Sequence, residues 1–229
     1  MKKVLTKSLY SKLKSDVYSY KFIENLMNFY DLYLFGGGVR DFLNNDLNSF
    51  RDLDFVVKSK NNEEEVCIEK FIPSFVKFKK NRFNGYKIYF KNCVIDIWDI
   101  NNTWAFKNNK LNSSVENLLK SVYLNIDSLL YDLNEDKYVN DCDKIYQNIK
   151  QLDILYNETP FENLNLLRAI VYKKKYSLEF SDKLKKTLHN YIRNNYSAID
   201  EFMILQKEHY NQYILNEYEL EKELAILTL

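Results

Sequence analysis

Glycine and proline are scarce in this chain. Its 229 residues include four glycines and two prolines, and three of the glycines are consecutive, at positions 36–38. Glycine serves where the backbone must turn tightly or approach a ligand closely. Because the chain has so little glycine elsewhere, the turn at 36–38 is the first candidate for a functional site.

Cysteine and histidine are also rare. The chain has three widely spaced cysteines and two histidines, and both histidines lie in its C-terminal part. An odd number of cysteines without regular spacing predicts reduced side chains that fill the core of a cytoplasmic protein. A zinc site built from cysteine and histidine is therefore not expected.

The sequence lacks long apolar runs and a large net charge. No stretch approaches the roughly 20 apolar residues that span a bilayer, and no apolar run follows the N-terminal lysines as in a secretory signal. We therefore expect no membrane partner. The formal net charge of +1 gives no overall basic field of the kind that nucleic-acid binders carry. The local clusters 77–82, 173–175 and 183–186 are either solvated faces or a surface for a polyanion.

The apolar periodicity changes along the chain and predicts an α+β fold. Helices are expected at 18–30, 39–43, 62–71, 142–150, 160–176, 180–194 and 197–227. Strands are expected at 32–35, 53–58, 74–79, 86–91 and 94–100, with the Asn84-Gly85 pair marking a hairpin. The segment 122–132 fits a strand or a helix. We predict a mixed-sheet domain over 1–150 and an all-α domain over 151–229.

The three glycines stand between an expected strand and an expected helix. This arrangement presents backbone N–H groups of Gly36 and Gly37 at the positive end of a helix dipole, which favours phosphate binding. Arg40 can add forked hydrogen bonds to a triphosphate. Asp41 either caps the helix or orients Arg40 or sugar hydroxyls. The alternative is a plain strand–turn–helix without a ligand.

Two acids, Asp52 and Asp54, stand at positions i and i+2 of an expected strand. Such residues point to the same face, so their charges repel one another unless a cation compensates. Mg²⁺ is a natural compensator because it prefers carboxylate oxygens together with substrate phosphates. The alternative is a loop aspartate and a strand-edge aspartate that never contact a metal ion.

A third acid, Asp96, lies inside the apolar strand 94–100. A buried and isolated carboxylate is costly, so we expect Asp96 to face the same cleft as Asp52 and Asp54. Asp99 is the competing candidate, and it would face the opposite side of a regular strand.

These motifs, Gly36-Gly37-Gly38-Val39-Arg40-Asp41 and Asp52-Leu53-Asp54, occur in an order that resembles a known family. The order is similar to that in the head domain of class II tRNA nucleotidyltransferases and bacterial poly(A) polymerases, within the polymerase β-like superfamily. The resemblance implies that Asp52 and Asp54 hold two Mg²⁺ ions, and that Asp96 is a third carboxylate, either a further metal ligand or a proton acceptor.

The resemblance also implies the reaction. A nucleoside monophosphate would pass from an NTP to a hydroxyl group, and pyrophosphate would leave. Gly36, Gly37 and Arg40 would hold the triphosphate. Positioning and charge neutralisation would supply most of the rate, because the protein provides no covalent nucleophile.

Two further segments resemble the family less closely. The family's RRDxTxNAL segment is matched by 121–129, where both arginines are replaced, Asp127 stands for the family's asparagine, and Lys120 can supply part of the lost charge. The family's EDxxRxxRA helix is matched by 161–170. There Glu162 and Asn165 occupy the base-reading positions and share a helix face, and Arg168 is expected to pack or pair. The alternative is an ordinary amphipathic helix.

We therefore expect a Mg²⁺-dependent nucleotidyltransferase that acts on an RNA 3′ end, first of all that of tRNA. The alternatives are a catalytically impaired nucleotide- or RNA-binding relative, and a toxin-like or antiphage enzyme that modifies another acceptor. Full CCA-adding enzymes carry further helical domains, so complete CCA addition is not expected. The amphipathic segment 217–229 would cover the helical domain or form a homodimer contact.

Overall fold

The structure is a computed structural model that describes residues 5–44, 52–61 and 65–225. The chain forms two compact units. The first comprises Met1–Ser121 and Asp127–Gln147, and the second comprises Val122–Ile126 and Asn148–Leu229. Within the described ranges, no helix combines the length and the apolar character needed to cross a bilayer.

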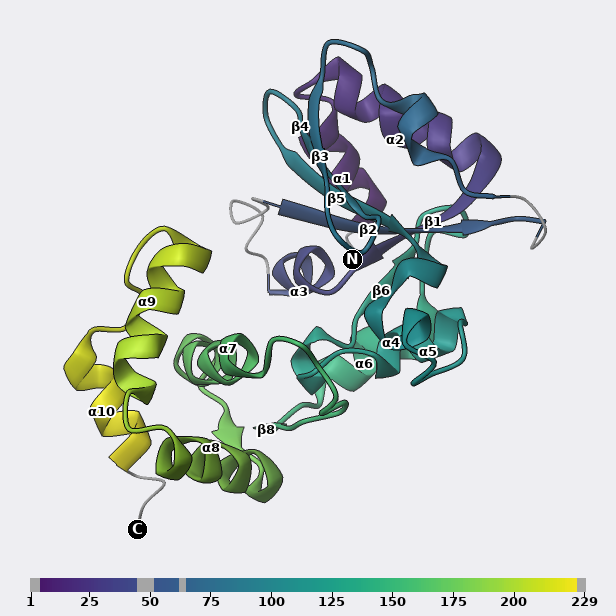
Figure 1. The fold of residues 1–229 in the computed structure, drawn as a ribbon. Helices are drawn as coiled ribbons and strands as arrows, with labels where there is room; N and C mark the ends of the chain where they lie inside the picture. The colour runs from purple at the N-terminus through teal and green to yellow at the C-terminus, as the bar shows by residue number, and fades with distance from the viewer. Residues whose placement is uncertain (1–4, 45–51, 62–64, 226–229) are drawn as a thin grey trace. The chain divides into compact units, whose positions relative to one another are not determined.

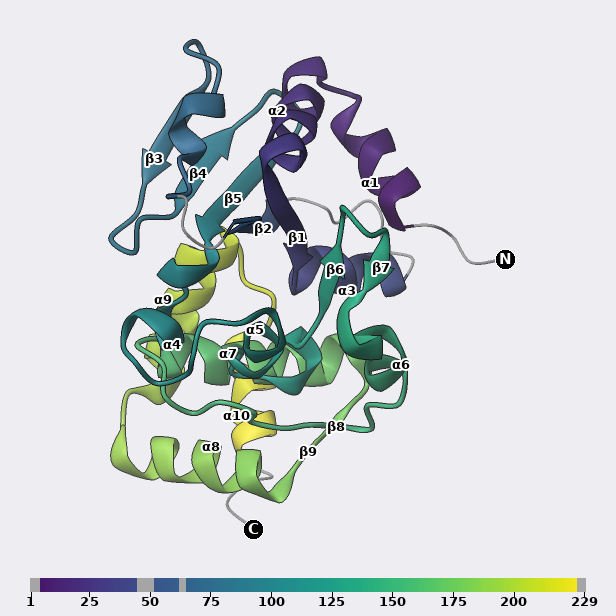
Figure 2. The same cartoon turned by 90° about the vertical axis from the view of Figure 1, so that its right-hand side faces the viewer.

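The first unit is built on a mixed sheet of seven strands, in the order β3-β4-β5-β2-β1-β6-β7. The strands are β1 (Tyr30–Phe35), β2 (Asp52–Ser59), β3 (Lys77–Lys80), β4 (Tyr86–Tyr89), β5 (Val94–Asp99), β6 (Leu130–Asp132) and β7 (Lys137–Tyr138). Strand β3 lies at one edge and β7 at the other (Figure 2). Strands β2 and β5 pair in parallel, and the other neighbouring strands pair antiparallel.

Helices cover both faces of this sheet (Figure 1). The helices of this unit are α1 (Leu5–Leu13), α2 (Val17–Phe29), α3 (Gly37–Leu43), α4 (Trp104–Lys107), α5 (Val115–Lys120) and α6 (Cys142–Gln147). Helices α1 and α2 lie on one face, and α3 lies on the other. Along β2, Leu53, Phe55 and Val57 are fully buried, whereas Asp52 and Asp54 alternate with them and are half-buried. The alternation of the sequence thus decides which face of β2 carries the acids.

The second unit is mainly helical. Its helices are α7 (Glu162–Tyr176), α8 (Asp182–Asn194), α9 (Ala198–Tyr210) and α10 (Glu217–Ala225), and a short parallel pair joins β8 (Gln151–Leu152) to β9 (Glu179–Phe180). The segment Val122–Ile126 belongs here because Leu124 bridges to Ile154 and the Asn125 N–H donates to the carbonyl of Asp153.

The predicted mixed sheet followed by a helical part is confirmed, but two predicted helices are wrong. Of the helix expected at 62–71, the described residues 65–71 contain only a 3₁₀ turn, η2 (Ile68–Phe71). The N–H of Cys67 donates instead to the hydroxyl of Tyr30, at 3.2 Å. The N–H group of Cys67 thus bonds to a side chain distant in the sequence and not to a carbonyl within a helix. The ambiguous segment 122–132 forms another 3₁₀ turn, η4 (Asn125–Asp127), and then β6.

The single helix expected at 197–227 is divided into α9 and α10. Asn211 adopts the left-handed conformation with φ 57°, which ends α9. Gln206, fully buried, then anchors the connecting loop. Its amide donates to the Leu215 carbonyl at 3.1 Å and accepts from the N–H groups of Ile214 and Leu215, at 2.9 Å and 2.8 Å. One side chain thereby satisfies three backbone groups of the turn.

We expect Gln206→Ala to lower the free energy of unfolding by about 2–4 kcal/mol, because it removes the hydrogen-bond partner of the buried N–H and carbonyl groups of Leu215 and of the partly buried N–H group of Ile214. Urea denaturation measures the change. Glu208→Ala on the exposed side of α9 is the matched control and should shift the midpoint little. An equal, small loss in both variants would contradict this role of Gln206.

Candidate active site

The glycine turn lies where β1 ends and α3 begins. Gly36 has φ +57°, a conformation that favours glycine, and its N–H donates to the carbonyl of Leu129 at 2.8 Å. At Gly38 a Cβ atom would come within 3.2 Å of the Leu34 side chain, so helix α3 packs tightly on β1. The predicted turn is present. The prediction that the Gly36 N–H group is available to bind a phosphate is wrong, because this group already donates to a backbone carbonyl.

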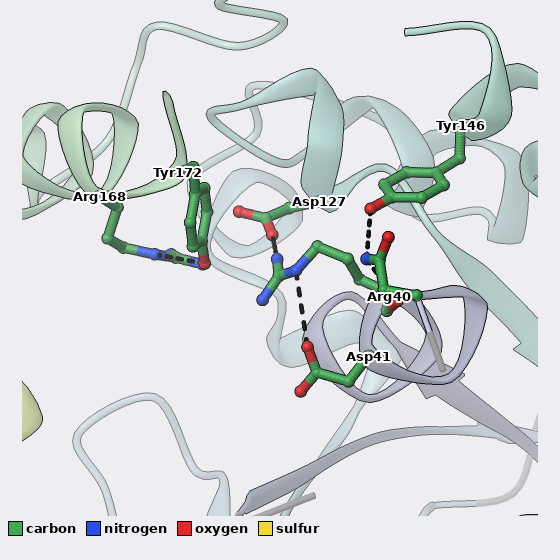
Figure 3. A network of polar contacts seen from close by, with 7 residues as sticks. Arg40, Asp41, Asp127, Tyr146, Arg168 and Tyr172 are labelled. Atoms are coloured by element: carbon green, nitrogen blue, oxygen red, sulfur yellow. Dashed lines mark hydrogen bonds and ion pairs between the residues drawn. The ribbon is translucent and has the colours of Figure 1, made fainter. Parts of the chain in front are cut away.

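Arg40 is buried, with 7% of its surface exposed, and it pairs with Asp127 (Figure 3). Its Nη1 donates to Asp127 Oδ1, and its Nε lies 3.9 Å from Asp41 Oδ1. Helix α3 begins at Gly37, so Asp41 lies in the second turn and does not cap the helix, which corrects one of its two expected roles. Its other role, orienting Arg40, agrees with the geometry.

Asn44 continues this network at the end of α3. Its side-chain amide donates to the carbonyl of Arg40 at 2.9 Å and to the hydroxyl of Tyr146 at 2.6 Å. Tyr146 belongs to α6, so the network fastens α3 to a helix about a hundred residues later (Figure 3). Nothing in the local sequence around Tyr146 indicated this contact.

The three predicted carboxylates lie on two neighbouring parallel strands. Asp54 of β2 is paired in register with Asp96 of β5, and Asp52 is paired with Val94. Register partners in a sheet point to the same face. The register therefore confirms that Asp96 shares the face of Asp52 and Asp54. Asp99 faces away and caps the 3₁₀ turn η3 (Ile100–Asn102), where it accepts from the N–H of Asn101 at 2.8 Å.

Lys87 of β4 also belongs to this site, and sequence reasoning missed it. Its Nζ lies 2.8 Å from Asp96 Oδ2 and 3.5 Å from Asp52 Oδ2. Burial alone would lower the pKa of the Lys87 ammonium, but Asp96 and then Asp52 outweigh burial and raise this pKa above its usual value. The alternation around Lys87 placed it on one face of a strand, and the Asn84-Gly85 hairpin predicted one neighbour of that strand, but neither revealed that β5 pairs with its other side.

The carboxylates fit a divalent cation in part. Asp52 and Asp54 share a strand face, and the ammonium of Lys87 shows that this face attracts positive charge. Two carboxylates leave ligand positions for phosphate oxygens and water, which suits Mg²⁺. Among the residues that the structure describes, no three Asp, Glu, His or Cys side chains gather closely enough to hold a metal ion by themselves. Direct ligation by Asp96 stays a prediction.

The remaining predicted residues lie at the ends of helices or within the second unit. Lys120 is exposed at the end of α5, and Glu162 is exposed at the start of α7. Asn165 is buried and donates to the hydroxyl of Thr159 at 3.3 Å, so it faces inward, unlike Glu162. Arg168 donates to the Tyr172 hydroxyl at 2.8 Å, as expected of a packing residue. Contacts of these four residues with a nucleotide stay predictions.

Comparison with known proteins places this geometry in a known fold. No family model matches the sequence, and no curated protein matches it. Solved structures match it over nearly the whole chain. The chain has the fold of the CCA-adding enzymes. A CCA-adding enzyme solved with ATP has a TM-score of 0.60 and 17% identity, over 90% of this chain and 49% of that chain.

Two further structures have the same fold. The Thermotoga maritima CCA-adding enzyme, solved with a tRNA, has a TM-score of 0.60 and 18% identity, over 91% of this chain and 48% of its own. A tRNA nucleotidyltransferase solved with a primer tRNA and an ATP analogue has a TM-score of 0.61 and 17% identity, over 90% and 60%. This chain thus spans about half the length of these proteins. At such low sequence identity, the structural likeness shows the shared fold alone.

Replacement of Asp127 tests the buried ion pair. Asp127→Ala should lower the free energy of unfolding by about 3–5 kcal/mol, because it leaves the Arg40 guanidinium buried without this partner. Asp127→Asn retains a hydrogen-bond acceptor and should cost less. Urea denaturation of both variants, and of the double variant with Arg40→Ala, measures the coupling. Additive losses in the double variant would contradict the pairing.

Replacement of Asp99 tests the opposite face of β5. Burial raises the pKa of the Asp99 carboxyl above 3.8. Protonated Asp99 therefore contributes to the free energy of unfolding at low pH, and this contribution is lost as the pH rises through the pKa of the folded state. Asp99→Asn keeps an acceptor for the Asn101 N–H. It should be more stable than the native chain at about pH 7, by less than about 1 kcal/mol since solvent screens the charge. The difference should shrink toward about pH 4 in urea denaturation, and a gain that is independent of pH would refute this cause.

Proposed function

We propose that this protein is a Mg²⁺-dependent nucleotidyltransferase that adds a nucleoside monophosphate from an NTP to an RNA 3′ end, with tRNA as the first candidate acceptor. One observation carries the proposal. The parallel register of β2 and β5 sets Asp54 beside Asp96 on the face that also carries Asp52, in a chain with the CCA-adding fold. The neighbouring structures solved with ATP or tRNA support the choice of substrate class.

Each residue of the site has a defined part in this proposal. Asp52 and Asp54 would hold Mg²⁺, which when bound would activate the acceptor hydroxyl and neutralise charge on the triphosphate. Asp96 would be the third carboxylate, as a ligand or as a proton acceptor. Asp127 and Asp41 keep the Arg40 guanidinium in place beside the glycine turn, where Arg40 would bind the triphosphate. Because this arrangement is held before substrate arrives, little reorganisation is needed on binding.

The test is a labelling assay with each of the four α-labelled NTPs, Mg²⁺ and total RNA, followed by mass analysis of the product. We expect the native protein to label RNA and Asp54→Ala to lose at least about a hundredfold in rate, since a cation ligand is removed. Asp99→Asn is the matched control. It changes an acid of the neighbouring strand that faces away from the site, and it should keep the native rate.

The outcomes separate the alternatives. Labelling of a protein or a small acceptor, but of no RNA, would favour an enzyme with another acceptor. Binding of an NTP and Mg²⁺ in calorimetry without any product would favour a catalytically impaired relative. Equal rates in Asp54→Ala and the native protein would exclude the proposed site.

A further inference from the structure

We infer that Lys87 is a built-in counter-ion of the carboxylate site, which holds Asp52 and Asp96 in the absence of a divalent ion and competes with that ion for Asp52. The inference rests on the proposed function in one respect, namely that Asp52 binds a divalent cation. It goes beyond that function because it concerns how this site is kept assembled and how readily it takes up the ion.

The backbone fixes the position of Lys87. Strand β4 pairs antiparallel with β5, and Lys87 is the register partner of Asp96. Its ammonium therefore lies on the carboxylate face because of the ladder and not because of a chance rotamer of a loop residue. The side chains of Tyr86 and Ile88 on either side are buried on the opposite face, which leaves Lys87 no other direction.

The ammonium also reaches across two strands. It contacts Asp96 at 2.8 Å on the neighbouring strand and Asp52 at 3.5 Å on the strand beyond. Its side chain is 38% exposed, whereas all four residues of the adjoining strand β3, three of them lysines, are exposed. Partial burial strengthens the attraction between the charges. Lys87 is thus engaged with two acids at once.

This geometry has a direct consequence for cation binding. Carboxylates that share a face repel one another, and a positive charge between them offsets the repulsion. A divalent ion that approaches Asp52 meets the positive charge of Lys87 within a few ångströms of the same oxygen. The ion must therefore displace Lys87 from Asp52, while Asp96, the nearer partner, retains the ammonium.

The test measures Mn²⁺ binding by calorimetry, with no nucleotide present. We expect Lys87→Met to bind Mn²⁺ about fivefold more tightly than the native protein, the change expected of a partly exposed ion pair. Lys87→Arg keeps the charge and should bind as the native protein does. Lys79→Met is the matched control, because Lys79 is the exposed register partner of Lys87 on β3 and has no ion-pair partner among the described residues.

Thermal unfolding provides a second measurement that does not depend on activity. In a chelator, Lys87→Met should melt at a lower temperature than the native protein, because Asp52 and Asp96 then lose the ammonium of Lys87. Saturating Mn²⁺ should remove most of that difference. Lys79→Met should melt as the native protein does in both conditions. If Lys87→Met does not fold, Lys87→Gln, which keeps a polar side chain, replaces it in both measurements.

The outcomes distinguish this inference from the proposed function. Tighter Mn²⁺ binding in Lys87→Met supports the inference, whether or not the native protein labels RNA. Unchanged or weaker binding overturns the inference, even if the native protein labels RNA in an Asp54-dependent way. Absence of Mn²⁺ binding in both proteins also overturns it. Equal tightening in Lys79→Met would show that general surface charge, and not Lys87, controls the affinity.

Discussion

The parallel pairing of β2 with β5 is the constraint on which the site depends. It sets Asp54 beside Asp96 although 42 residues separate them in the chain. Parallel neighbours need a long connection, and here part of that connection is the β3–β4 hairpin, which returns to pair β4 with β5. The same topology that brings the acids together therefore also brings Lys87 to them. The strand order of the sheet therefore explains why the acids and the Lys87 ammonium lie close together.

A second constraint acts on the other side of the glycine turn. The buried pair of Arg40 and Asp127, with the hydrogen bond from Gly36 to Leu129, ties α3 and the turn to the segment that leads into β6. A buried guanidinium would be costly without its partner. Arg40, the proposed triphosphate-binding residue, is thus held in place by a residue 87 positions later in the sequence. The same ion pair therefore stabilises the fold and fixes the position of this side chain.

Local chemistry explains most of the agreement between the predicted and the observed elements. The glycine turn and the shared face of Asp52 and Asp54 follow from backbone freedom and from period-two alternation, whereas the register of β2 with β5 decides that Asp96 shares that face. The two wrong helices differ in cause. At Cys67 the N–H group bonds to Tyr30, which lies outside the segment 62–71, and periodicity within the segment cannot reveal that contact. At Gln206 the side chain bonds to Ile214 and Leu215 within the segment 197–227, and these hydrogen bonds stabilise a loop where the apolar periodicity predicts a helix.

The sequence by itself determined which acids share a strand face and where the glycine turn lies. Residue spacing alone puts two acids on one face of a strand and a glycine turn between a strand and a helix, because these are properties of neighbouring residues. Only the tertiary structure decided the partners. Lys87 joined the acids, Asp127 paired with Arg40, and Asn165 turned inward to Thr159, because strand order and packing place distant residues within reach of one another.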